Sequence, residues 1–237
     1  MPSHLDVPCL KDGEYLNDSV IDFFFGLLTA RAARDDNTEL AILGSYTLTK
    51  IQMIIKERLP NIAKLKLKEK LNGAALRQTL KLKEEQHREG LLKNFAYRWF
   101  VHPRANIQKI EPSVNRVILP YNISNNHWAL AVVFLSARKV LYYCSSRGPI
   151  SKEFQQYITV LFDTLSKFRG YGQFGGGWTF ERVAGQLPKQ KDGVSCGVFL
   201  CAFADCIADG REPSGFGQRE ILSLRAALRV LVESIAR

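Results

Sequence analysis

The residue that most directly suggests covalent chemistry is Cys196, which lies in the segment KQKDGVSCGVFLC. Gly193 and Gly197 flank it, and an apolar run with the character of a buried helix follows. At the start of a helix, unpaired backbone N–H groups and the positive end of the helix dipole favour a thiolate and can stabilise an oxyanion. Most free cysteines are instead buried small hydrophobes, and this is our interpretation of Cys201 and Cys206, inside the predicted helix.

A thiol nucleophile needs a nearby base, and histidine is the usual one. His127 lies in NISNNHWALAVV, where a polar turn meets an apolar strand, so its ring is expected at a strand end. Gln190 lies six residues before Cys196, where its amide can donate to the same oxyanion as the helix N–H groups. Each of these two signals is weak when taken alone. The remaining histidines, which lack a comparable setting, are His4, His87 and His102.

These residues must be positioned by a mixture of helices and strands. Asn17 or Asp18 is a suitable N-cap for the first predicted helix, and Gly210 is a suitable C-terminal stop for the helix after Cys196. Three apolar runs predict strands, and the short link 136–138 between the last two predicts a hairpin. The pattern indicates one α+β domain over residues 1–237. The predicted helices are 16–33, 152–168, 196–210 and 218–236, and the predicted strands are 115–121, 127–135 and 139–143.

Residues 61–96 differ from the rest because lysine, leucine and other good helix formers dominate them. We interpret this stretch as a basic helical insertion, interrupted at Gly73 and Gly90. Its lysines form either a solvated face or a docking surface for an acidic partner or nucleic acid.

Composition limits the classes of function. The chain has 237 residues and a formal net charge of +10, yet it contains no nucleic-acid-binding motif that we recognise. No run of 18 apolar residues occurs, so we expect no membrane-spanning helix, and the first residues do not resemble a signal peptide. The five cysteines form no CxxC pair, which favours free thiols in a reducing nuclear or cytoplasmic setting over disulfides, a metal site or another cofactor.

Three blocks together resemble the SUMO/sentrin-specific (Ulp-type) cysteine protease family. They are YLNDSVIDFFFGLL, NHWALAVVFLSARKVLYYCSS and LPKQKDGVSCGVFLCAFADCI. They are similar to the family's opening helix, its histidine strand with the following hairpin, and its P-x-Q-x-N-G-x-D-C-G signature. The histidine, glutamine and cysteine also follow the family's order. The resemblance implies a papain-like or adenain-like fold, with a central mixed sheet flanked by helices.

The resemblance also implies a reaction and a set of roles. The family's cysteine cleaves after the C-terminal Gly-Gly of SUMO or a related ubiquitin-like modifier. By position, Cys196 corresponds to the nucleophile, His127 to the general base and Gln190 to the oxyanion donor. Further matches concern substrate binding: Trp128 corresponds to the roof of the diglycine tunnel, Tyr15 to a second tunnel aromatic and Asp18 to a modifier-binding carboxylate.

The clearest departure from the family pattern is Cys144, which stands seventeen residues after His127, where the family has its third catalytic residue, an aspartate. Ser195 and Asp192 also replace the family's acidic residue and asparagine before the nucleophile. Three alternatives stay open. The Cys–His pair works without a carboxylate at reduced rate, the protein is a pseudo-protease that only binds a modifier, or Cys144, His127 and Cys196 hold zinc.

Overall fold

The computed structural model describes residues 2–3, 6–57, 73–101, 110–168 and 176–235. Its centre is a five-stranded mixed sheet in which the strands follow one another in chain order. The three central strands pair antiparallel, and each edge strand pairs parallel to its neighbour. This confirms the predicted mixed sheet. The strands are β1 (Leu40–Ile42), β2 (Arg116–Ile123), β3 (His127–Phe134), β4 (Lys139–Tyr143) and β5 (Thr179–Arg182).

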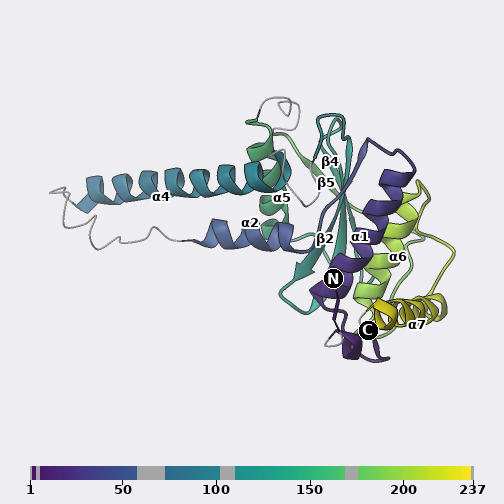
Figure 1. The fold of residues 1–237 in the computed structure, drawn as a ribbon. Coiled ribbons are helices and arrows are strands. Elements are labelled where there is room, and N and C mark those ends of the chain that lie inside the picture. The colour runs from purple at the N-terminus through teal and green to yellow at the C-terminus, as the bar shows by residue number, and fades with distance from the viewer. Residues whose placement is uncertain (1, 4–5, 58–72, 102–109, 169–175, 236–237) are drawn as a thin grey trace.

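Helices cover both faces of the sheet (Figure 1). One face carries α1 (Asp18–Arg34) and α6 (Cys196–Ala208), with α7 (Gln218–Ile235) packed outside them. The other face carries α2 (Tyr46–Lys56), α5 (Lys152–Leu165) and the C-terminal end of α4 (Gly73–Ala96). Because successive side chains of a strand point to opposite faces, β3 contributes to both cores. Its Leu130 and Val132 pack under α6, whereas Ala131 and Val133 pack on the opposite side.

The elements around the predicted catalytic residues form for local reasons that the sequence contains. The side chain of Asn17 accepts a hydrogen bond from the Val20 N–H and caps α1, as predicted. The β3–β4 link is a tight hairpin turn in which Arg138 has a positive φ of 49°. Gly210, with φ of 73°, follows the end of α6 and confirms the predicted stop.

The insertion departs from its prediction. Its residues 61–72 lie outside the described part of the chain. Gly73 is the first residue of α4, so the interruption predicted at Gly73 is not tested by the described residues. The helix α4 continues unbroken through Gly90, so the interruption predicted at Gly90 is wrong. A Cβ atom at Gly90 would meet nothing within 4 Å, and strong helix formers on both sides offset the intrinsic cost of a glycine. At about 1.5 Å per residue, α4 projects far from the sheet beside α2 (Figure 1).

Four shorter or less patterned elements were not predicted: β1, α2, β5 and the π-helical turn η2 (Tyr97–Val101). A further short element, the 3-10 helix η1 (Val7–Leu10), packs against α7. Among the described residues, no helix is long and apolar enough to span a membrane.

Candidate active site

The helix α6 begins at Cys196 itself. The N–H groups of Val198 and Phe199 both donate to the carbonyl of Ser195, 3.0 Å away, and close the first turn. The run that follows is apolar and almost wholly buried, because it packs against both β3 and α1. Cys196 itself has 0% of its surface exposed. The predicted nucleophile therefore lies at a helix start, as expected, and within the protein interior.

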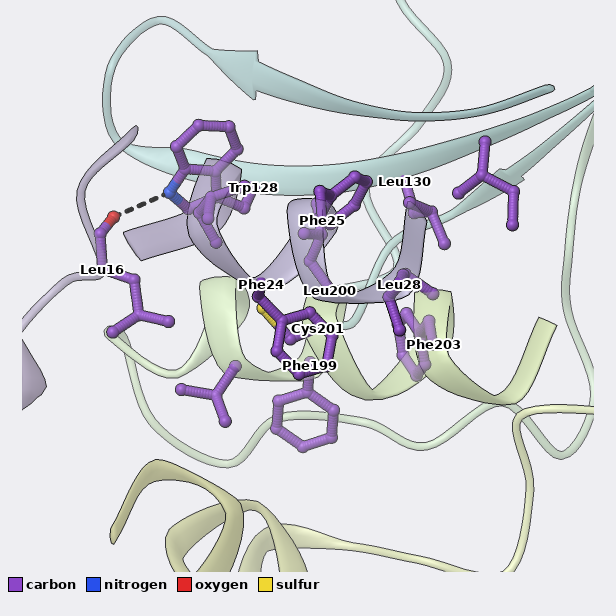
Figure 2. Packing of buried hydrophobic residues seen from close by; sticks show 14 of the residues in the cluster. Leu16, Phe24, Phe25, Leu28, Trp128, Leu130, Phe199, Leu200, Cys201 and Phe203 are labelled. Carbon is purple, nitrogen blue, oxygen red and sulfur yellow. Dashed lines mark hydrogen bonds between the residues drawn. The ribbon is translucent and has the colours of Figure 1, made fainter. Parts of the chain in front are cut away.

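Close packing of three segments holds this helix start in place (Figure 2). The indole Nε1 of Trp128 donates to the carbonyl of Leu16 at 2.9 Å, which connects β3 to the residue before the N-cap of α1. Gly197 lies directly against both residues. A Cβ atom at this position would lie 2.9 Å from the Leu16 Cβ and 3.2 Å from the Trp128 Cδ1. Only glycine allows the helix to approach this closely.

We expect Gly197→Ala to lower the free energy of unfolding by about 1–3 kcal/mol. The added methyl group would lie 2.9 Å from the Leu16 Cβ, which is shorter than the contacts that Cβ atoms make in folded proteins. Gly26→Ala is the matched control. Gly26 lies within α1 with nothing within 4 Å of its would-be Cβ, so the same change should stabilise by about 0.5–1 kcal/mol. Urea unfolding of both variants measures the difference. Equal effects would contradict the packing argument.

Asp192 organises the loop before the nucleophile. Its carboxylate accepts hydrogen bonds from the N–H groups of Val194 and Ser195, at 3.0 and 2.8 Å. It also accepts from the Ser195 hydroxyl at 2.7 Å and from the Gln218 amide on α7. Burial works against the charged form, but these hydrogen bonds, the Ser195 hydroxyl first, lower the pKa of Asp192. The residue that departs from the family's asparagine thus holds the loop in shape.

We expect Asp192→Ala to destabilise the protein by about 1–2 kcal/mol at neutral pH, because two backbone N–H groups lose their acceptor. The loss is no larger because solvent screens this exposed carboxylate. The folded pKa is depressed, so this contribution is present above the unfolded pKa near ~4 and is lost as pH falls through the folded value. Unfolding measured at pH 7 and at acid pH tests this. Asp192→Asn, which keeps an acceptor without the charge, should lose little and show no such pH dependence.

His127 begins β3 and is bonded to the predicted third position. Its Nε2 lies 3.2 Å from the Cys144 Sγ and 3.2 Å from the Ser146 Oγ. Cys144 is the residue that follows the end of β4. The Cys144 sulfur lies 3.1 Å from the Ser146 hydroxyl and accepts from the Gly148 N–H at 3.3 Å. Cys144 is 1% exposed, whereas Ser146 lies at the surface, so the sulfur is the buried end of this network.

The electrostatics of the site couple two thiols to one imidazole. Hydrogen bonds to Cys144 and then to Cys196 raise the pKa of His127 to about 9, against the opposing effect of burial. For Cys144 burial is the largest influence and acts to raise the pKa. Hydrogen bonds from His127, Ser146 and Gly148 outweigh it and lower the pKa to about 7. The structure therefore brings Cys196, His127 and Cys144 together: the imidazole is hydrogen-bonded to the Cys144 sulfur, and the Cys196 thiol is close enough to raise the pKa of the imidazole.

The remaining predicted residues lie around this centre. The side-chain Oε1 of Gln190 accepts from the Ser145 hydroxyl at 2.6 Å, and its Nε2 donates to the backbone carbonyl of Asp192 at 2.7 Å. The role of Gln190 as oxyanion donor stays a prediction. Trp128 is buried beside the helix start. Tyr15 is 47% exposed, and its hydroxyl lies 4.0 Å from where a Cβ of Gly193 would stand.

Asp18 lies exposed in the first turn of α1. Partial burial and the neighbouring Asp22 raise the pKa of its carboxyl, while a hydrogen bond with Asn122 on β2 opposes them. Its predicted contact with a modifier stays a prediction.

Sequence reasoning missed the parts played by Ser146, Gly148 and Asp192. The only available signal was their nearness in sequence to Cys144 and Cys196. The zinc alternative gains no support, because the described residues contain no group of three or more histidine, cysteine or acidic side chains arranged to hold a metal ion. All five cysteines are free.

The family model described as "Ulp1 protease family, C-terminal catalytic domain" matches residues 75–237. The chain belongs to the Ulp1 protease family. This confirms the family that the three sequence blocks indicated.

Curated relatives of this Ulp1-family chain are similarly named. Ubiquitin-like-specific protease 1 of Saccharomyces cerevisiae is 23% identical over 136 residues, covering 57% of this chain and 20% of that protein. Ubiquitin-like-specific protease 1A of Arabidopsis thaliana is 24% identical over 204 residues, covering 85% of this chain and 33% of that protein. The chain thus spans a third or less of the length of these two relatives.

Solved structures agree in fold. A structure of the SUMO protease Ulp1 with its catalytic cysteine oxidized to a sulfinic acid matches with a TM-score of 0.63 at 16% identity, covering 98% of this chain and 83% of that one. The C-terminal Ulp1 protease domain in complex with Smt3, the yeast ortholog of SUMO, matches with a TM-score of 0.62 at 14% identity, covering 98% and 82%. The expected Ulp-type α+β fold is therefore confirmed.

Proposed function

We propose that this chain is a cysteine isopeptidase and peptidase that cleaves after the C-terminal Gly-Gly of SUMO or a related ubiquitin-like modifier. The observation that carries the proposal is the placement of the His127 imidazole at the start of β3, hydrogen-bonded to Cys144 and with its pKa also raised by the Cys196 thiol at the start of α6. A thiol, a base and a helix N-terminus together are the parts that acyl transfer through a thioester requires.

The chemistry follows from this placement. His127 accepts the proton of the Cys196 thiol, and the sulfur attacks the carbonyl carbon of the terminal glycine. When the C–N bond breaks, the imidazolium gives its proton to the leaving amine. Water then attacks the thioester, with His127 as base, and releases the modifier's carboxylate and the free thiol. The N–H groups at the start of α6 and the Gln190 amide are the proposed donors to the oxyanion.

The packing around the nucleophile supports a diglycine substrate. Leu16, Trp128 and Gly197 pack closely beside Cys196, and we propose that only a segment without side chains, such as Gly-Gly, can be admitted at this point. Tyr15 and Asp18 are the exposed residues that we propose contact the approaching modifier. The five free cysteines support a reducing nuclear or cytoplasmic setting.

A panel of modifier probes tests the proposal. SUMO, NEDD8-like and ubiquitin probes, each ending in an electrophile after Gly-Gly, are incubated with the protein, and the labelled residue is located by mass spectrometry. We expect labelling of Cys196 by at least one probe, and none in Cys196→Ala. Binding of a probe without labelling would overturn the proposal in favour of the modifier-binding module. The bonded partner that His127 retains at position 144 favours the enzyme.

A further inference from the structure

We propose that Cys144, acting as a thiolate, fills the role of the family's missing carboxylate: it is a positioning residue that orients His127 and stabilises its imidazolium during acyl transfer. This inference rests on the proposed function, since it concerns the same site. It changes the meaning of the departure at this position, from the loss of a catalytic group to its replacement by a different anion.

The geometry around the sulfur is that of an anion site. The backbone N–H of Gly148 can only donate, so at 3.3 Å it makes the Cys144 sulfur an acceptor. The Ser146 hydroxyl, 3.1 Å away, and the His127 Nε2, 3.2 Å away, can donate to the same atom. Three donors converging on one buried sulfur favour its charged form. Because the sulfur itself is buried, its attraction to the imidazolium is screened less than it would be in water.

The backbone produces this arrangement in one turn. Arg147 adopts a positive φ of 60°, and its N–H donates to the Cys144 carbonyl at 2.9 Å. The chain therefore folds back, so that Ser146 and Gly148 both face the side chain of Cys144. Gly148 also lies close: a Cβ on it would stand 3.6 Å from the sulfur.

Other titratable groups around the sulfur come from the three elements packed there. His127 comes from β3. Cys196 comes from α6 and interacts with the same imidazole. Tyr142 comes from β4, two residues before Cys144 and on the same face. Burial, and then the neighbouring sulfur, raise the pKa of the Tyr142 phenol, so this group stays protonated throughout the working range. His127 is thus the group that exchanges protons with the two thiols.

The protonation states define when the arrangement works. With Cys144 ionised, Nε2 of His127 keeps its proton, and the proton that Nδ1 takes from Cys196 completes the imidazolium that the Cys144 thiolate stabilises. The depressed pKa of Cys144, about 7, means that the anion is lost as pH falls through this value. The raised pKa of His127, about 9, means that the imidazolium is lost as pH rises through it. The intact pair therefore exists between these limits.

A first experiment measures the ionisation of the Cys144 thiol and does not depend on turnover. Thiolate ultraviolet absorbance is titrated in Cys196→Ala between pH 5 and 9. Burial raises the pKa values of Cys9, Cys201 and Cys206, so these thiols stay silent over most of this range. We expect one thiolate to appear near pH 7 and to vanish in Cys196→Ala/Cys144→Ala. A first ionisation near pH 9 overturns the inference, and this readout is independent of whether any modifier is cleaved.

A second experiment reads the role. We expect Cys144→Ala to lower kcat by at least about tenfold with a smaller change in KM, because the imidazolium loses its anion. Cys144→Asp should retain or raise kcat and move the acid limb of the pH–rate profile from near 7 to below about 5, since a carboxyl ionises there. Cys206→Ala is the matched thiol control and should leave the profile unchanged. An acid limb that stays in place in Cys144→Asp means a merely structural role.

Discussion

Turnover of a modifier substrate is expected to fall by at least about 10⁴-fold when Cys196 is replaced by alanine, because the covalent pathway disappears with its sulfur. The overall fold should survive, since alanine is smaller than cysteine and is a good helix former at the start of α6. The measurement is kcat/KM for a SUMO substrate with a fluorogenic leaving group after Gly-Gly. Affinity for the uncleaved modifier should be unchanged.

His127→Ala supplies the companion measurement. It should cost nearly as much as Cys196→Ala, and the double variant should be little worse than either, because nucleophile and base act as a unit. Cys206→Ala, on the same helix but remote from the imidazole, should keep normal turnover. Additive losses in the double variant, or full activity without His127, would remove the assignment of these two residues.

Stability should depend most strongly on Arg225 of α7, which is only 1% exposed. Its Nη1 donates to the carbonyls of Cys9 and Lys11, at 3.2 and 3.1 Å, and its Nη2 to that of Val194 at 3.5 Å. One guanidinium thus joins α7 to the segment around η1 and to the loop before the nucleophile. We expect Arg225→Leu to lower the free energy of unfolding by about 3–5 kcal/mol, because three backbone carbonyls lose a donor that they share and two segments lose their connection to α7.

The control is on the same helix. Arg229 is exposed and pairs with Glu233 one turn away at 2.8 Å, so Arg229→Leu should change stability by no more than about 0.5 kcal/mol. Urea unfolding measures both variants. Similar values for the two arginines would show that the buried hydrogen bonds contribute little. Because Val194 lies two residues before Cys196, Arg225→Lys is also expected to slow probe labelling.

Elements with strong local patterns could be predicted from the sequence. The apolar runs of β2, β3 and β4 give strands that are mostly buried, and the predicted bounds differ from the observed ones by no more than two residues. β5 has exposed or half-exposed residues throughout and pairs with one neighbour only, so no pattern of burial marks it. β1 has three residues, too few for a period to be read.

The sequence predicted which residues form the site, but it did not predict the hydrogen bonds between them. The order of His127, Gln190 and Cys196 identified the family, and seventeen-residue spacing marked Cys144. What the sequence could not provide was the turn at Arg147, which brings two donors onto the Cys144 sulfur. The sequence therefore indicated that the negative charge of the aspartate is lost at Cys144. A sequence pattern does not show which atoms surround a side chain, and those atoms decide whether the thiol is charged.

The complete burial of Cys196 has a consequence for anyone seeking to count or block it. A small alkylating reagent in solution meets the half-buried Cys9 before it meets the interior sulfur, so total thiol modification does not report occupancy of the active centre. A selective covalent inhibitor must bring enough recognition surface to displace the side chains above the sulfur. The electrophilic group of such an inhibitor provides the reactivity. The part that binds the protein and opens the site provides the selectivity for Cys196 over the other thiols.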